Sequence, residues 1–222
     1  MPLHSLCITL FFCTVLPTII CSGNVDYDDE YYYYEETSTQ ENESGDHQTN
    51  NGKNPQKDEV DLDIAKFLNT TEKIWVYNST EATDISCKVD VVHNVTNNTC
   101  YFTRYYLSNH TPKHDDFSAD LLKNPYSPGH SGTPDEMKIR DGDPNTPFET
   151  LIYQSADNLC AVFYLNFPSN MRVSSWFELR LKNSSLENGP NKECMQDYAD
   201  YLSTKKLNTH FNYTSECQCI FQ

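Results

Sequence analysis

The chain has 222 residues, with 32 Asp and Glu against 16 Lys and Arg, and its formal net charge is −16 at pH 7. So acidic a chain repels nucleic-acid phosphates and anionic membrane surfaces, which excludes both as expected partners. The charge favours cationic ligands or basic protein surfaces instead.

Residues 1–23 have the features of a secretory signal peptide. The apolar run from Leu6 to Cys21 is too short for a comfortable membrane span, and it ends in the small residues Ser22 and Gly23, as cleavage by signal peptidase requires. The alternative is a buried helix or an uncleaved anchor. No later apolar stretch is long enough to cross a bilayer, so we expect a secreted, extracellular protein.

Residues 24–60 form an acidic segment that has almost no aliphatic side chains. Between Asn24 and Asp63, thirteen carboxylates stand against two lysines. The segment has too little apolar area to offset a chain entropy of roughly 1–2 kcal/mol per residue, and we expect it to be a disordered tail.

Five tyrosines lie among the carboxylates of this tail, in surroundings that favour tyrosine sulfation. The candidates are Tyr27, Tyr31, Tyr32, Tyr33 and Tyr34. Each sulfate would add a fixed negative charge, as phosphorylation does, and such a strip suits a basic partner such as a chemokine or a coagulation protease. The alternative is a solubilising spacer in which the tyrosines are incidental.

Residues 61–222 carry the pattern of one folded domain. The three-residue spacing of Leu62, Ala65 and Leu68 predicts a short amphipathic helix. Strands are then predicted at residues 73–77, 85–92, 99–107, 136–140, 148–154, 159–167 and 174–182. Residues 110–134 contain four prolines, which predicts a long surface connection with a little structure at 117–122. Residues 168–171 are expected to form a hairpin turn.

The strand at 174–182 alternates on both of its faces. Trp176, Glu178 and Arg180 share one face, which suits a sheet that turns one side to a cavity and the other to a packed layer. A helix is predicted at residues 191–203 and a final extended segment at 210–221. Because a long antiparallel meander must protect its edges, we expect a mainly β fold: a closed antiparallel barrel with a short N-terminal and a C-terminal helix.

Glycosylation sequons and cysteines support export. The sequons are at Asn42, Asn69, Asn78, Asn94, Asn97, Asn109, Asn183 and Asn212. Of nine cysteines, Cys7, Cys13 and Cys21 belong to the signal peptide. The remaining six are an even set that suits three disulfides, and the sequence alone allows fifteen pairings.

No motif of catalysis or of metal binding is found in the sequence. His110 and His114 have the four-residue spacing of a zinc helix, but Pro112 between them prevents a regular helix. Neither a His-Glu-x-x-His nor a Gly-x-Ser-x-Gly motif occurs. We therefore expect a binding protein and not an enzyme, without a metal or a cofactor.

The helix followed by Lys73-Ile-Trp75-Val-Tyr77 and the positions of the cysteines resemble the tick salivary lipocalins of the histamine-binding protein family. The resemblance covers residues 61–222 and implies a lipocalin-like barrel that sequesters a host mediator. It also implies a Cys160–Cys194 disulfide and a bond from Cys87 to Cys217 or Cys219. We take Cys87–Cys217 and assign the remaining pair to Cys100–Cys219.

Amine-binding members of this family carry Cys-Asp-aliphatic, then Glu-Leu-Trp/Tyr, then a further cysteine. The chain has Cys160-Ala161-Val162, Glu178-Leu179-Arg180 and Cys194. The resemblance thus implies that Glu178 binds an amine such as histamine or serotonin. The alternatives are an ion pair between Glu178 and Arg180, and a lipid mediator as the ligand.

Aromatic residues of the strands are further candidates to line the pocket, although strand aromatics usually just pack. The full set of candidate ligand-binding residues is Glu178, Trp176, Arg180, Phe163, Tyr153 and Tyr77.

Overall fold

The structure is a computed structural model, and it describes residues 61–127, 132–141, 146–166 and 175–221. The predicted signal peptide, the acidic tail with its tyrosines, Asn42 and the turn at 168–171 lie outside the described residues. The helices and strands in chain order are α1 (Ile64–Leu68), β1 (Ile74–Ser79), β2 (Ile85–Val95), β3 (Thr99–Ser108), β4 (Thr111–Leu122), β5 (Glu136–Ile139), β6 (Phe148–Gln154), β7 (Cys160–Asn166), β8 (Trp176–Lys182), α2 (Lys192–Lys205) and β9 (Phe211–Asn212). None of the described helices has the length and apolar character to span a membrane.

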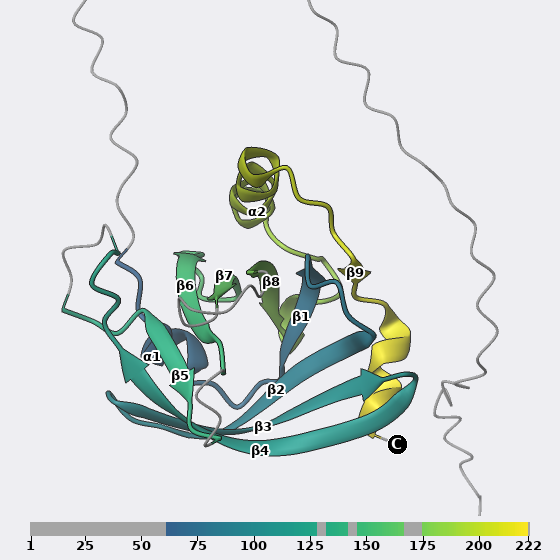
Figure 1. Ribbon diagram of the computed structural model, residues 1–222, viewed down its shortest axis with the longest axis horizontal. Coiled ribbons are helices and arrows are strands. Elements are labelled where there is room, and N and C mark those ends of the chain that lie inside the picture. The colour runs from purple at the N-terminus through teal and green to yellow at the C-terminus, as the bar shows by residue number, and fades with distance from the viewer. Residues whose placement is uncertain (1–60, 128–131, 142–145, 167–174, 222) are drawn as a thin grey trace, which may run out of the picture. The chain divides into compact units, whose positions relative to one another are not determined.

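Strands β1 to β8 form a closed antiparallel barrel, as the sequence predicts (Figure 1). Each strand from β2 to β7 pairs with the next along the chain, and β1 closes the barrel by pairing with both β8 and β2. β9 adds a two-residue pairing beside β1. Closure pairs most strands on both sides, but residues 111–118 of β4 extend beyond β5.

Strand β4 corrects the expectation of a long surface connection at residues 110–134. β4 pairs with the whole length of β3, from Ser108↔Thr111 to Thr99↔Asp120. Pro112 is tolerated because it lies near the hairpin end, where β5, which pairs only with residues 119–122, does not reach it. The proline content of this segment was therefore a misleading signal.

Helix α1 packs on the apolar part of the barrel interior. Asp63 caps the helix by accepting a hydrogen bond from the Lys66 backbone N–H at 2.9 Å. The buried residues of the helix are Ile64, Phe67 and Leu68. They pack in one cluster with interior residues of the strands, among them Ile74, Phe102, Leu121, Leu151 and Phe163. This cluster fills the end of the barrel at which β2 finishes.

Helix α2 covers the outer face of β7 and β8, which explains the two-sided alternation of β8. Phe177, Leu179 and Leu181 point outward and pack with Cys194 and Tyr198 of α2. The opposite face of β8 points into the barrel. A buried side chain on each face is the pattern expected for a strand between a cavity and a packed layer.

Two of the three disulfides that the resemblance implies are formed. Cys87 is bonded to Cys217 and Cys160 to Cys194. The pairing of Cys100 with Cys219 is wrong, because Cys100 is a free thiol buried in the apolar interior. Since Cys100 points into the barrel from β3, no C-terminal cysteine outside the barrel can reach it.

The C-terminal segment also differs from the extended segment expected at residues 210–221. Only Phe211 and Asn212 form a strand, and the 3-10 helix η2 (Ser215–Phe221) follows. This helix packs against the outer face of the barrel around Trp75. The Trp75 Nε1–H donates to Asn183 Oδ1 at 3.0 Å, so Trp75 lies outside the cavity.

Seven of the predicted glycosylation sites are in the described residues. Six of these asparagines are exposed: Asn69, Asn94, Asn97, Asn109, Asn183 and Asn212. Asn78 is half-buried, and its Nδ2 donates to Asn212 Oδ1 on the neighbouring strand. Glycosylation itself stays a prediction.

Candidate ligand pocket

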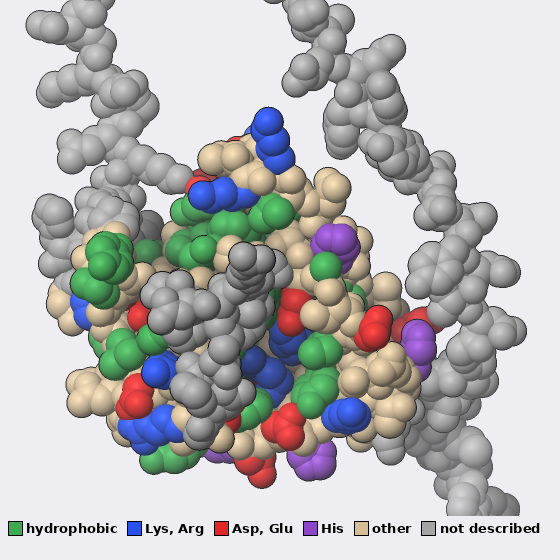
Figure 2. All heavy atoms as spheres, in the orientation of Figure 1, with side chains coloured by type: hydrophobic (Ala, Val, Ile, Leu, Met, Phe, Trp, Pro, Cys, Tyr) green, Lys and Arg blue, Asp and Glu red, His purple; other side chains and the backbone are tan. Residues whose placement is uncertain are grey.

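A pocket of about 270 Å³ opens at the end of the barrel opposite α1. Its walls come from all strands from β2 to β8 and from the ends of neighbouring loops, and they include Glu81, Lys88, Arg104, Tyr106, Asp115, Phe117, Asp141, Glu149 and Trp176. Figure 2 shows basic and acidic side chains together within the hollow of this face. The pocket is therefore unusually rich in charge for the mouth of a barrel.

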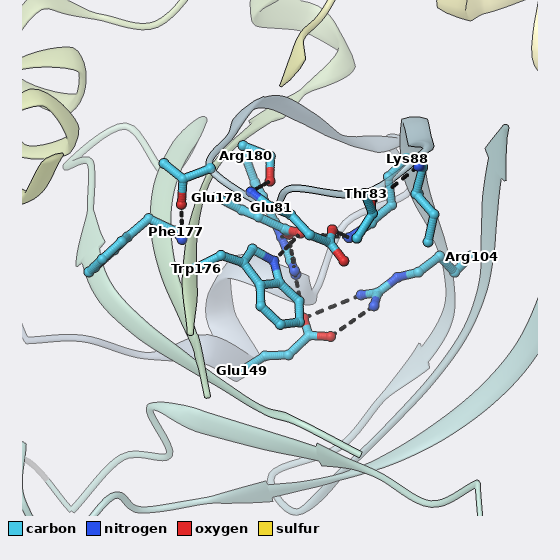
Figure 3. A network of polar contacts seen from close by, with 12 residues as sticks. Glu81, Thr83, Lys88, Arg104, Glu149, Trp176, Phe177, Glu178 and Arg180 are labelled. Atoms are coloured by element: carbon cyan, nitrogen blue, oxygen red, sulfur yellow. Dashed lines mark hydrogen bonds and ion pairs between the residues drawn. The ribbon is translucent and has the colours of Figure 1, made fainter. Parts of the chain in front are cut away.

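Trp176 lies between the pocket and the deeper interior. Its Nε1–H donates to Glu178 Oε1 at 3.1 Å, which fixes the indole against the carboxylate below it (Figure 3). The same oxygen accepts a hydrogen bond from Lys88 Nζ at 2.7 Å. Lys88 also binds Glu81 at 2.8 Å, nearer to the pocket entrance.

Arg180 lies deeper in the barrel, on the same face of β8 as Glu178. Arg180 Nε donates to Glu178 Oε2 at 2.8 Å, and Nη2 donates to Glu149 Oε2 at 2.6 Å. The guanidinium carbon is 4.3 Å from the centroid of the Phe163 ring. Nη1 has no hydrogen-bond partner among the described residues and lies 3.8 Å from Asp90 Oδ2.

A second arginine continues this network across the barrel. Arg104 Nε and Nη2 donate to the two oxygens of Asp90 at 2.7 and 2.8 Å, in a bidentate pair. Arg104 Nη1 donates to Glu149 Oε1 at 2.8 Å. Glu149 thus joins two guanidinium groups, as Figure 3 shows. The network holds four carboxylates (Glu81, Asp90, Glu149 and Glu178) and three cations (Lys88, Arg104 and Arg180).

The charged state of these groups follows from their neighbours. Burial raises the pKa of Glu149, but Arg104 and Arg180 outweigh it and lower the pKa to about 2. Burial acts on Glu178 in the same direction, and Arg180 with Lys88 holds its pKa well below the usual range. Both carboxylates therefore remain ionised inside the barrel at neutral pH.

The pKa values of the cations rise for the reciprocal reason. Burial lowers the pKa of Lys88, but the attraction of Glu178 and then of Glu81 outweighs it. The pKa of Arg180 is raised in the same way by Glu149 and Glu178. The network is consequently a set of full charges in which three cations offset all but one of the four negative charges.

The six candidate ligand-binding residues fall into four places. Trp176 lines the pocket, and Glu178 and Arg180 lie beneath it as an ion pair, one of the alternatives left open by the sequence. Phe163 belongs to the interior core below Arg180. Tyr77 and Tyr153 are on the outside of the barrel, in the layer covered by α2, and they do not line the pocket.

The sequence analysis missed the partners of Glu178. Lys88, Arg104 and Glu149 are each buried and point inward. A signal was present, because Lys88 and Asp90 alternate with the apolar Val89, as inward-facing strand residues would. The alternation of Lys88 and Asp90 with Val89 along β2 thus indicated that both charged side chains point into the barrel.

Both carboxylate oxygens of Glu178 are occupied by Trp176, Lys88 and Arg180. An amine could bind there only by displacing one of these donors. The carboxylates nearest the pocket entrance are Asp115, which accepts from Tyr106 Oη at 2.8 Å, and Asp141, which accepts from Thr146. In the described part of the chain, no group of three His, Cys, Asp or Glu side chains is arranged to hold a metal ion.

The comparisons with known proteins agree with this architecture. The profile of the family described as tick histamine binding protein matches residues 51–219. The chain belongs to this family. No curated protein sequence matches the chain.

Solved structures extend the family assignment to the fold. AM182 in its serotonin complex is similar with a TM-score of 0.50 and 13% identity, over 70% of this chain and 92% of that one. Japanin from Rhipicephalus appendiculatus, bound to cholesterol, is similar over 59% and 86% with a TM-score of 0.38 and 13% identity. The cockroach allergen Per a 4 is similar over 72% and 92%, with a TM-score of 0.45 and 13% identity. The first likeness shows that the chain shares the fold of that protein.

Proposed function

We propose that the protein is an exported lipocalin that captures a small cationic host mediator, such as a biogenic amine, in the pocket above Trp176. The observation that carries the proposal is the pairing of carboxylates with aromatic rings at one small opening. Asp115, Asp141 and Glu81 supply negative charge, and Trp176 and Tyr106 supply ring faces. A cation that leaves water needs these two kinds of contact.

The size of the pocket favours an amine over a lipid mediator. Its volume of about 270 Å³ lies just below the ~300–1,000 Å³ typical of ligand pockets. Below it, the charged network fills the space that a long acyl chain would need, and such a chain would have to displace paired, buried charges. The family and the AM182 serotonin complex make amines the first class to test.

Export is supported by sequence features and disulfides, whereas a role in host defence rests on the family resemblance. Disulfides such as Cys87–Cys217 persist in oxidising compartments, and sequons are modified on the secretory route. We place binding ahead of catalysis because the family to which the chain belongs is described by histamine binding. A basic protein partner for the acidic tail stays a prediction, and removal of residues 24–60 would abolish that interaction.

Titration calorimetry with histamine, serotonin and a long-chain fatty acid tests the proposal. We expect saturable heat from at least one amine and none from the fatty acid. Asp115→Asn should weaken amine binding, because the loss of one charge-assisted contact costs about 1.5–3 kcal/mol, or roughly 10–150-fold in Kd. Heat from the fatty acid alone would contradict an amine as the ligand and would indicate a lipid instead.

The matched control for this variant is Asp116→Asn. Asp116 is the next residue of the same exposed strand, but it faces outward and accepts from Thr103 Oγ1 at 2.6 Å. Its substitution changes the net charge of the protein by the same amount. Equal effects of Asp115→Asn and Asp116→Asn on amine affinity would contradict binding in the pocket.

A further inference from the structure

The deepest part of the charged network has the form of a binding site that is already filled. Glu149 and Glu178 direct one carboxylate oxygen each at the Arg180 guanidinium, and Phe163 places its ring against the guanidinium at 4.3 Å. Glu149, Glu178 and Phe163 are completely buried. We refer to these three residues as the inner cage.

Two carboxylates and one aromatic face are the contacts with which proteins bind free organic cations. Each carboxylate gives a charge-assisted hydrogen bond, and the ring face attracts positive charge. The inner cage supplies all of these contacts to a cation that enters from its own wall, because Arg180 is two residues from Glu178 on β8. We propose that Arg180 is a tethered occupant of a cation site that would otherwise bind a small guanidinium or primary ammonium ion.

The charge of the network supports this assignment. With Arg180 in place, three cations stand against four carboxylates. Without the guanidinium, only Lys88 and Arg104 would remain to balance them, in an interior where an unpaired charge is strongly unfavourable. The vacated cage would therefore attract a soluble cation of the same shape.

This occupancy sets the depth to which a ligand enters the barrel. The inner cage borders the pocket through Glu149, which belongs to both, and Arg180 occupies the cage by donating to Glu149 at 2.6 Å and to Glu178 at 2.8 Å (Figure 3). Arg180 thus acts as a specificity-determining residue that keeps any ligand cation above Trp176. This consequence rests on the proposed function, whereas the cage and its occupant do not.

Chemical rescue of Arg180→Ala tests the proposal. The variant should lose roughly 6–20 °C in melting temperature, because breaking a buried ion pair leaves an uncompensated charge. Methylguanidinium at millimolar concentration should restore at least half of this loss in a saturable manner. N-methylurea, a neutral molecule of the same shape, should restore none. Equal effects of the two molecules would overturn the proposal.

Two variants control for the position and the space. Arg180→Met removes the same charge but keeps the cage filled, so methylguanidinium should not rescue it. Arg140→Ala removes an exposed arginine that pairs with Asp120 at the surface, and it should respond to neither molecule. Rescue of Arg180→Met to the same extent as Arg180→Ala would show that the cation acts elsewhere.

A variant that fails to fold still decides the question. Arg180→Ala is then refolded with methylguanidinium or with N-methylurea, and native far-ultraviolet and near-ultraviolet dichroism is measured. Recovery only with the cation supports the proposal, and recovery with both or with neither overturns it. Failure of the unaltered protein to bind any amine would count against the proposed function alone, because this rescue needs no natural ligand.

Discussion

Glu178 and Arg180 lie two residues apart on β8, point into the same interior and are joined by a hydrogen bond of 2.8 Å from Arg180 Nε to Glu178 Oε2. Glu178 is the residue at which the family resemblance implies an amine. In this chain its two oxygens are held by donors of the protein itself. In the proposed function the ligand contacts therefore come from side chains nearer to the pocket entrance, and the buried Glu178–Arg180 pair has a structural role.

Glu149 is the residue on which the stability of this network depends most. It accepts from Arg104 at 2.8 Å and from Arg180 at 2.6 Å, so Glu149→Gln leaves two buried guanidinium groups incompletely paired. We expect the free energy of unfolding to fall by about 3–5 kcal/mol in urea denaturation. Asp120→Asn, which breaks an exposed pair with Arg140, should change it little. Similar losses for the two variants would contradict the assigned role.

The same carboxylate predicts how stability responds to acid. The pKa of Glu149 is lowered from 4.5 to about 2 in the folded protein, so its contribution is complete above pH 4.5 and is lost as the pH falls toward 2. We expect the unfolding free energy to decrease through this window. Glu149→Gln should show a shallower decrease there, since the group that takes up the proton is gone. If the unfolding free energy of Glu149→Gln fell as steeply in this pH window as that of the unaltered protein, Glu149 would not be the group responsible.

Cys100 should be protected from thiol reagents in the folded state. Burial, with the nearby charges of Asp90 and Glu149, raises the pKa of this thiol to about 12. The thiolate, which is the reactive form, is therefore almost absent at neutral pH. Alkylation with iodoacetamide followed by peptide mass spectrometry should label Cys100 only after unfolding in urea. Equal labelling rates with and without urea would contradict the interior position.

The two disulfides should contribute unequally because they close loops of different length. Cys87–Cys217 spans 130 residues and Cys160–Cys194 spans 34. The chain-entropy relation gives about 5 kcal/mol for the first and about 4 kcal/mol for the second. Replacing each pair by serine and measuring denaturant unfolding tests this order. A larger loss for the Cys160–Cys194 pair would show that local contacts of α2 outweigh loop entropy.

The sequence predicted the barrel because alternation along strands is a local property. The two faces of β8 and the helix α2 follow directly from the side-chain periodicity. β4 was missed because Pro112 and the later prolines were interpreted as strand breakers. Pro112 is tolerated because no strand pairs with β4 on its other side at this point, which depends on where β5 lies in space. Such neighbours are not visible in one sequence.

The candidate site was predicted only in part for a similar reason. The alternation of β8 placed Trp176, Glu178 and Arg180 on one face, and their direct pairing followed from that placement. Lys88 and Glu149 lie on strands that are distant from β8 in the sequence. Only the closure of the barrel brings them to Glu178 and Arg180. The pairing of Cys100 failed because the resemblance covers no cysteine at that position.

The chain has two tryptophans, one at the pocket and one outside the barrel, which allows a direct test of the central claim that the ligand binds above Trp176. Trp75→Phe leaves Trp176 as the only tryptophan, and Trp176→Phe leaves Trp75. Histamine does not absorb at the excitation wavelength of tryptophan, so its titration reports on the protein alone. We expect a saturable change in the fluorescence of Trp75→Phe and none in that of Trp176→Phe. A change confined to Trp176→Phe, or saturable binding by calorimetry without any response from Trp176, would contradict the account.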